Sequence, residues 1–157
     1  MTKNLAIQLA READSEIIAE LVQSVAHYCL SDPSGSGAEG FINSISQESI
    51  SKYINSADFI YALCFINSKL AGVAALRNNT HIYHLFVNPD FHRLGIGRKL
   101  WQFLKSEAEN LGNPGSFTVN SSIFAVPVYS AFGFVPVGEP QVKNGVQFQP
   151  MQISANG

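Results

Sequence analysis

The apolar and polar positions of the chain alternate, or gather in runs, in a way that predicts several short strands. Alternation over residues 4–9 and 82–87 is typical of strands with one buried face. Nearly continuous apolar runs at residues 59–66 and 70–76 are typical of strands covered on both faces. Further strands are expected at residues 116–120, 134–137 and 146–153. Together these segments predict a sheet of about seven strands.

Apolar residues recur at helical spacing in the segments between the strands. A helix is expected from Asp14 or Ser15, either of which could cap it, to about Leu30. Its buried side would consist of Ile17, Ile18, Leu21, Val22 and Val25. The longest helix, over residues 96–111, would bury Ile96, Leu100, Phe103, Leu104, Ala108 and Leu111. Shorter helices are expected over residues 44–54 and 126–132, and the glycine- and serine-rich segment 31–40 predicts a loop.

The order of these elements predicts one mixed α/β (α+β) domain over residues 1–157. Asn67-Ser68-Lys69 joins the two continuous apolar runs as a hairpin at the centre of the sheet, and residues 77–80 turn into a third antiparallel strand. Pro150 cannot donate a ladder hydrogen bond, so the last strand is expected at an edge or a bulge. The expected architecture is a central, mostly antiparallel mixed sheet with helices on both faces.

The segment between the strand at 82–87 and the helix at 96–111 has the layout of an anion site. The first turn of a helix has backbone N–H groups without intrahelical partners and carries the positive end of the helix dipole. Gly95 and Gly97 would let a ligand approach these groups. Arg93 and Arg98 flank the glycines and offer charge-assisted donors that suit phosphate oxygens. A phosphate-binding loop is therefore predicted, although Arg98 could also be a solvated helix charge.

Two common phosphate motifs do not fit this loop. A P-loop needs Gly, four residues and then Gly-Lys-Ser/Thr, and the chain has no such run. The dinucleotide fingerprint needs a small residue where Leu100 stands and an acidic residue near Phe117. His92-Arg93-Leu94-Gly95-Ile96-Gly97 instead resembles the acyl-CoA loop of the GNAT acetyltransferase family, Gln/Arg-x-x-Gly-x-Gly/Ala, with His92 replacing the usual first residue.

A second segment carries the same resemblance. In the GNAT family an Asn ends the fifth strand, and the short helix that follows ends in Tyr-x-x-x-Gly-Phe. Here Asn120 follows an apolar strand, and the run from Tyr129 to Phe134 reads Tyr-Ser-Ala-Phe-Gly-Phe. Both matches stand in the expected order and structural context, and the resemblance extends from about Leu5 to Ile153.

The resemblance implies that acetyl-CoA is the cofactor, with its pyrophosphate held by the loop residues His92, Arg93, Leu94, Gly95, Ile96, Gly97 and Arg98. It also implies that the pantetheine arm lies between the splayed fourth and fifth strands beside Phe86 and Val87, and that an N–H at a strand bulge polarises the acetyl oxygen. Tyr129 is implied as the acid that gives a proton or hydrogen bond to the departing thiolate; alternatively it is a core aromatic. Asn120 either contacts pantetheine, caps the next helix or bonds to a loop.

The expected reaction is acetyl transfer to a primary amine by direct attack in a ternary complex. His84 is the nearest titratable residue on the central strand and could act as the base, but a lone histidine on a strand is more often packed, with water relaying the proton. No motif identifies the amine, and segment 31–40 could be a lid beside its pocket or a plain loop. The alternatives are a non-catalytic acyl-CoA-binding module and transfer of a longer acyl chain.

Composition and charge narrow the classes of partner. An apolar fraction of 46% with 11 Phe argues against disorder. A formal net charge of −2 and a pI near 6.0 argue against a nucleic-acid partner. The chain lacks an apolar run long enough for a membrane span and a signal-like N-terminus, so a cytoplasmic location without membrane contact is expected. Cys29 and Cys64 have no metal-ligand spacing and are expected as buried thiols, without a metal site. Edge pairing through the last strand would allow a homodimer.

Overall fold

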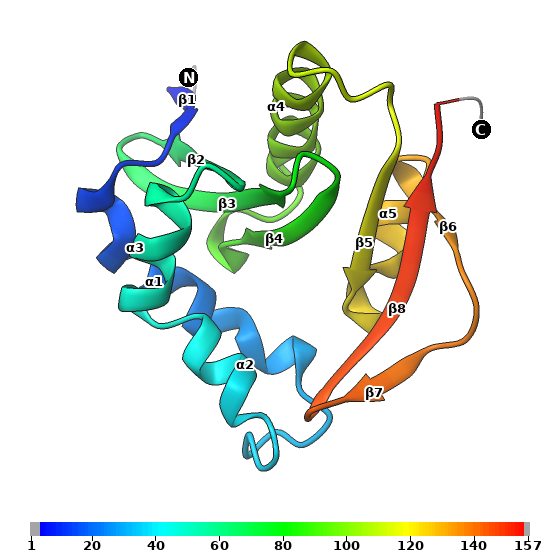
Figure 1. Ribbon diagram of the computed structural model, residues 1–157. Helices are drawn as coiled ribbons and strands as arrows, with labels where there is room; N and C mark the ends of the chain where they lie inside the picture. Colours follow the sequence, from blue (N-terminus) through cyan, green and yellow to red (C-terminus); the bar gives the residue numbers. More distant parts are fainter. Residues whose placement is uncertain (1–3, 156–157) are drawn as a thin grey trace.

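The computed structural model describes residues 4–155 (Figure 1). Its strands are β1 (Leu5–Leu9), β2 (Phe59–Ile66), β3 (Lys69–Arg77), β4 (His81–Val87), β5 (Phe117–Ser121), β6 (Val135–Pro136), β7 (Gln141–Lys143) and β8 (Val146–Ile153). Its α-helices are α1 (Ser15–Val25), α2 (Glu39–Ser44), α3 (Gln47–Asn55), α4 (Ile96–Asn110) and α5 (Val126–Ala131). Short 3₁₀ turns occupy Glu12–Asp14, Ala26–Cys29, Pro89–Phe91 and Ile123–Ala125.

The eight strands of the described residues form one mixed sheet. They lie in the order β1-β2-β3-β4-β5-β8-β6. Strand β6 pairs with the C-terminal end of β8, and β7 pairs with its N-terminal end. All pairings are antiparallel except that of β4 with β5, which is parallel. The predicted fold class, a mostly antiparallel α/β sheet with helices, is therefore confirmed. The short strand β7 brings the count to one more than the seven expected.

Helices cover both faces of the sheet. On one face α4 packs with Leu100, Trp101 and Leu104 into a core that also contains side chains of β5 and α5. On the other face α1 and α3 pack through Ile18 and Ile50 against β2 and β3. In Figure 1, α1, α2 and α3 lie together at the lower left, whereas α4 lies beside β3 and β4, and α5 lies beside β5 and β8.

Gly72 in β3 lets α4 lie close to the sheet. A Cβ atom at this position would meet Ile96 Cγ2 at 2.9 Å and Leu100 Cδ1 at 3.0 Å. Such distances are too short for two carbon atoms, because close-packed carbons separate by about 3.5–4.0 Å. The start of α4 is therefore fixed directly over β3, next to the end of β4.

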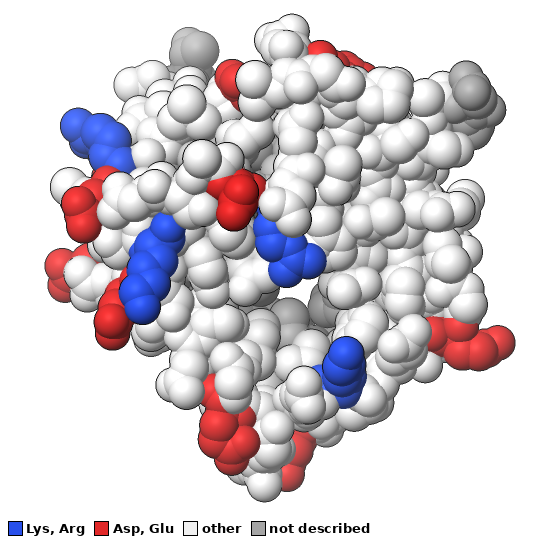
Figure 2. Space-filling model, in the orientation of Figure 1, with Lys and Arg blue, Asp and Glu red and all other residues white. Residues whose placement is uncertain are grey.

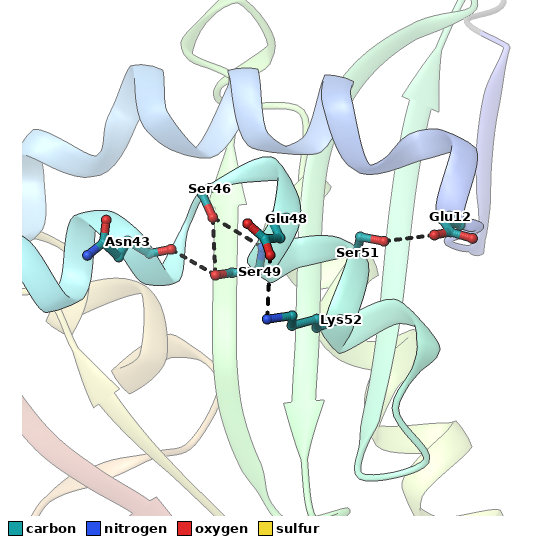
Figure 3. Close-up of polar contacts among 7 residues, drawn as sticks. All are labelled: Glu12, Asn43, Ser46, Glu48, Ser49, Ser51 and Lys52. Atoms are coloured by element: carbon teal, nitrogen blue, oxygen red, sulfur yellow. Dashed lines mark hydrogen bonds and ion pairs between the residues drawn. The ribbon is translucent and has the colours of Figure 1, made fainter.

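The segment predicted as a second helix, residues 44–54, contains the end of α2 and most of α3 instead. Ser46 caps α3, because its Oγ accepts the N–H of Ser49 at 3.1 Å. Ser49 Oγ in turn donates to the carbonyl of Asn43 at 2.8 Å, and Ser51 Oγ donates to Glu12 Oε1 at 3.1 Å (Figure 3). One continuous helix was the wrong prediction, because a capping serine satisfies N–H groups that such a helix would bond internally.

Two residues predicted on buried helix faces are exposed. Ile17 is 37% exposed and Leu111 is 67% exposed. Neighbouring residues on a helix point about 100° apart, so α1 buries Ile18 fully and turns Ile17 outward. Leu111 lies just beyond the end of α4. The first helix also ends earlier than predicted, at Val25, and a 3₁₀ turn follows it.

The last strand, β8, lies inside the sheet, so its placement at an edge was wrong. It pairs with β5 on one side and with β6 and β7 on the other. Pro150 stands between the residues of β8 that pair with β6 and those that pair with β7, where its missing N–H costs little. Its carbonyl still accepts the N–H of Val137 at 2.8 Å. The homodimer stays a prediction, but β8 gives it no support.

Candidate functional site

The sheet opens where β4 meets β5. These two strands pair only through His81 with Thr118 and Ile82 with Val119. Further along, Phe86 and Val87 remain paired with β3, while the end of β5 remains paired with β8. Beyond those two residue pairs β4 and β5 are no longer hydrogen-bonded to each other, and a cavity of about 870 Å³ lies where they separate. All of the predicted site residues except Leu94 line this cavity.

The loop between β4 and α4 forms one wall of the cavity. Among the described residues, no hydrogen-bond acceptor is found for the backbone N–H groups of residues 93–98, whereas the next N–H, of Lys99, bonds to the carbonyl of Gly95 at 3.0 Å. Arg93 and Gly95 have φ angles of +67° and +75°, and such left-handed residues turn successive N–H groups toward one concave side. The result is an anion-binding concavity at the start of a helix of 15 residues.

The two glycines leave the mouth of this concavity open. A Cβ atom at Gly95 would meet nothing within 4 Å, and one at Gly97 would meet only Val87 Cγ2, at 3.8 Å. Because Gly95 adopts a left-handed φ, only glycine takes this position without strain. The space that side chains would fill is available to a ligand, so the residues present fit the diphosphate of CoA.

The two arginines of the loop differ in their contacts with the rest of the protein. Arg93 is exposed and forms no ion pair within the described part of the chain. Arg98 reaches α5, where Nη2 lies 3.4 Å from the carbonyl of Ala131 and the guanidinium lies 5.2 Å from the Phe132 ring centre. His92 is exposed at the cavity, and Leu94 is the loop residue that does not line it. We name the loop residues 92–98, together with Phe86 and Val87, the loop wall.

Tyr129 lies in α5 on the opposite side of the opening. Its ring packs edge-on against Phe132 and Phe134, at centroid distances of 6.0 and 5.7 Å. The side chain is 5% exposed, and within residues 4–155 its hydroxyl makes no hydrogen bond. Burial, and to a lesser extent the neighbouring Cys29, raises the pKa of Tyr129 above its usual range. The phenol therefore stays protonated, with a donor available to a ligand in the cavity.

His84 is buried in β4 and bonded to Tyr61. Its Nδ1 lies 2.8 Å from the Tyr61 hydroxyl, and burial lowers the pKa of His84 to about 3. Tyr61 has a single proton and, among the described residues, no second partner, so donation from Tyr61 to Nδ1 leaves no buried donor unsatisfied. In that arrangement the neutral ring carries its proton on Nε2. At the cavity His84 is then a hydrogen-bond donor.

A bulge lies in β4 next to His84. The register with β3 passes from Ala75 opposite His84 to Leu76 opposite Ile82, so Tyr83 has no partner across the ladder. The Tyr83 hydroxyl lies 3.0 Å from that of Tyr53, which itself donates to the carbonyl of Ser44 at 2.8 Å. Tyr53 has one proton, so Tyr83 must be the donor in their contact. The bulge expected on the central strand is thus present, and it is tied to the end of α2.

Asn120 lies in β5 between two cavities. It lines the large cavity and a second one of about 730 Å³, which also share Phe41, Ser44 and Val146. The cap of the following 3₁₀ turn is Ser122, whose Oγ accepts the N–H of Ala125 at 3.2 Å. Asn120 as a cap was therefore the wrong alternative, and its side chain is left to face the cavities.

Residues from several segments far apart in the sequence complete the lining of the two cavities. We name Phe41, Ser44, Arg77, Lys143 and Phe148, which line one or both cavities, the hairpin wall. Two hydrogen bonds hold the β7–β8 hairpin against residues 30–31: Ser31 N–H donates to the carbonyl of Gly145 at 3.0 Å, and Gln147 Nε2 donates to that of Leu30 at 3.2 Å. Sequence reasoning missed Arg77, which stood in an expected turn, and Lys143, in an unexpected strand. No local signal marks either residue.

Three other properties of the described residues complete the description. Within residues 4–155, no three His, Cys, Asp or Glu side chains come together as a metal site. None of the helices in the same range is both long and apolar enough to cross a membrane. Cys29 lines the large cavity, and burial raises the pKa of its thiol to about 11.

Comparison with known protein families adds an independent finding. The family model described as the acetyltransferase (GNAT) domain matches residues 29–155. A UPF0039 protein of Schizosaccharomyces pombe is 27% identical over 92 residues, which cover 55% of this chain and 61% of that protein. The chain thus matches less than two thirds of the length of this relative.

Solved structures share the fold at low sequence identity. A GCN5-related N-acetyltransferase from Rhodopseudomonas palustris superposes with a TM-score of 0.78 at 18% identity, covering 98% of each chain. The PaiA N-acetyltransferase of Thermoplasma acidophilum, solved in complex with coenzyme A, gives a TM-score of 0.75 at 16% identity, covering 95% of this chain and 98% of that one. These similarities extend over nearly the whole chain.

Proposed function

The chain belongs to the GNAT acetyltransferase family, and we propose that it is an acetyl-CoA-dependent N-acetyltransferase that acetylates a primary amine by direct attack in a ternary complex. The observation that carries the proposal is that the unbonded N–H groups of residues 93–98 and the protonated side chain of Tyr129 border the same opening between β4 and β5. A diphosphate site and a proton donor on one cavity are what acyl transfer from a CoA thioester needs.

The loop wall is proposed to hold the cofactor. N–H groups of residues 93–98 and the guanidinium of Arg93 would bind the diphosphate, and Arg98 would bind it from the first turn of α4. Phe86 and Val87 on β4, with Asn120 on β5, would border the pantetheine arm. Bound there, acetyl-CoA supplies an activated acetyl thioester. A backbone N–H at the Tyr83 bulge is proposed to stabilise the oxyanion, a contact that typically contributes about 3 kcal/mol.

The transfer itself needs two proton movements. The neutral amine nitrogen attacks the carbonyl carbon, the C–N bond forms and the C–S bond breaks, so the nitrogen loses a proton and the sulfur leaves as thiolate. Tyr129 would donate a hydrogen bond or its proton to the sulfur and regain the proton from solvent. With a pKa of about 3 and Nε2 already protonated, His84 is a poor base. Water in the cavity would therefore take the proton of the amine.

An acetylated cysteine is not needed on this route. Cys29 is the cysteine that lines the cavity, and a thiol whose pKa is about 11 is almost entirely protonated at neutral pH. A thiol is a weak nucleophile compared with its thiolate. We therefore expect no acetyl-enzyme in the absence of an amine, which intact-protein mass spectrometry after mixing with acetyl-CoA would check.

The test is product analysis with a mixed amine library. The protein, acetyl-CoA and the library are incubated, and mass spectrometry then searches for amines heavier by one acetyl group. The Tyr129→Phe variant serves as the matched control for background acetylation by the thioester. Amide products that depend on Tyr129 support the proposal. CoA binding by calorimetry without any product would favour the non-catalytic module, and turnover only with longer thioesters would favour the other acyl donor.

A further inference from the structure

Charge is distributed unevenly around the two cavities. Of the residues that the structure describes, no Asp or Glu lines either cavity, although the chain contains 12 acidic residues. The hairpin wall contributes two cations, Arg77 at the large cavity and Lys143 at the second. In Figure 2 a hollow lies near the centre of this face, with Lys or Arg groups at its upper and lower right margins and an Asp or Glu group beyond the upper one, farther from the hollow. A ligand that enters from this side meets positive charge.

Neither cation forms an ion pair with a residue that the structure describes. The two ion pairs of residues 4–155 are Arg11 with Asp14 and Lys52 with Glu48, so Arg77 and Lys143 have no carboxylate partner there. Their charge is therefore available to a ligand. A polycationic acceptor, such as a polyamine, would be repelled and would find no carboxylate to bind its ammonium groups.

Arg77 is the better placed of the two for specific recognition. Its guanidinium lies 5.3 Å from the centre of the Tyr83 ring, and Tyr83 is held in turn by Tyr53. This cation–π contact holds the guanidinium beside the β4 bulge, where the reacting carbonyl is expected. Burial is the main cause that lowers the pKa of His81, and the positive charge of Arg77 is the second. The electric field of Arg77 therefore reaches the start of β4. Lys143 is exposed on β7, next to the turn at Asn144 and Gly145.

The rest of the hairpin wall is apolar or uncharged. Phe41 and Phe148 line it, and Ser44 stands where the two cavities meet. Such a surface suits the carbon skeleton of a small amine, while an anionic group of that amine would be drawn to the guanidinium. Arginine binds carboxylate and phosphate oxygens through two parallel N–H donors, which lysine cannot do.

We propose that the acceptor is a small amine that also carries an anionic group, such as an α-amino acid, and that Arg77 is the residue that selects it. This inference rests on the proposed function, because it names the substrate class of that same site. Lys143 adds attraction at the entrance, whereas Arg77 contacts the anionic group directly.

The experiment compares amines that differ only in the anionic group. Each α-amino acid is presented beside its carboxamide, and phosphoethanolamine beside ethanolamine, with spermidine as the polycation. Both kcat/KM, from CoA release, and affinity for the CoA-bound protein, from calorimetry, are measured. The expected result is that the anionic member of a pair is preferred about tenfold or more, as for a charged hydrogen bond. The carboxylate and phosphate pairs separate the two kinds of anion.

Variants of Arg77 assign the preference to this residue. Arg77→Gln should lower kcat/KM for the anionic member of each pair by about tenfold or more, so that most of the anion preference is lost, and Arg77→Lys should restore part of it. Lys69→Gln, an exposed residue at the other end of β3, is the matched control. Equal or better handling of carboxamides, ethanolamine or spermidine by the parent protein would overturn the inference while the proposed function stands. Anion preference in binding without any turnover would instead contradict the proposed function alone.

Discussion

The loop wall lines the large cavity and the hairpin wall lines the large cavity and the second one, and the two walls are built in opposite ways. The loop wall comes from the end of β4 and one continuous segment, residues 92–98, whose backbone supplies the binding groups. The hairpin wall joins residues from α2, β3, β7 and β8, and side chains supply its chemistry. Backbone N–H groups are present whatever the side chains are, so a backbone site keeps the same ligand when the sequence changes. A site made of side chains can acquire a different ligand through a few substitutions. The loop wall therefore suits the proposed cofactor, and the hairpin wall suits the proposed acceptor.

The largest effect is expected from closing the loop wall. Gly97→Val places a branched side chain where a Cβ meets only Val87 at 3.8 Å, so the fold should tolerate it. The new methyl groups would keep a diphosphate from several N–H groups, each contributing roughly 1.5–3 kcal/mol to a charged ligand. CoA affinity, measured by calorimetry, should fall more than about a hundredfold.

Two controls belong with this variant. Gly97→Ala should give an intermediate loss, because its side chain is smaller. Gln102→Val introduces the same residue on the exposed face of α4 and should leave CoA affinity unchanged. Parental CoA affinity in a folded Gly97→Val protein would mean that the diphosphate does not bind at this loop.

The second effect concerns Tyr129, between the two walls. Tyr129→Phe removes a hydroxyl for which residues 4–155 provide no partner and keeps the ring packed against Phe132 and Phe134. The melting temperature should change little, while kcat should fall by about a hundredfold, the lower end of the range for general acids. Steady-state kinetics and thermal unfolding measure the two quantities. A large loss of stability with unchanged kcat would return Tyr129 to the role of a core aromatic.

What could be predicted from the sequence follows the same division. Gly95, Gly97 and Tyr129 stand in short motifs whose chemistry is local, so both the strand-loop-helix layout and its residues could be identified in advance. Arg77 at the end of β3 and Lys143 in β7 are far apart in the sequence and line two neighbouring cavities only in the folded chain, so no spacing along the chain predicts their roles. Pro150 shows the same limit, because whether its missing N–H faces an edge depends on which strand arrives beside it.

A smaller effect should separate the two arginines of the loop wall. Arg93 has no ion pair within residues 4–155, so Arg93→Ala should weaken CoA binding by about tenfold, with stronger dependence on salt in the parent than in the variant. The guanidinium of Arg98 already contacts the carbonyl of Ala131 and the Phe132 ring. Arg98→Ala should therefore weaken CoA binding less than Arg93→Ala does, and it should also lower the melting temperature. Calorimetry at two salt concentrations distinguishes them. A salt-independent Kd in the parent would remove both arginines from the phosphate site.

The smallest effect on catalysis, and a distinct effect on stability, is expected from His84 behind the bulge. Burial lowers the pKa of His84 to about 3, while an unfolded histidine titrates near 6.5. Between these values the unfolded chain binds a proton that the folded chain excludes, so the stability contributed by neutral His84 is complete above about pH 6.5 and is lost as the pH falls toward 3. The loss should be at most about 1.4 kcal/mol per pH unit. His84→Asn, which can still accept a hydrogen bond from Tyr61, should flatten the slope of unfolding free energy against pH in denaturant titrations, whereas the exposed control His27→Asn should not.

The pH profile of kcat/KM should keep its shape in His84→Asn, because a group that titrates near 3 cannot produce a limb near neutrality. Loss of such a limb would identify His84 as the base. The central strand would then supply a catalytic side chain in addition to the backbone N–H proposed to stabilise the oxyanion.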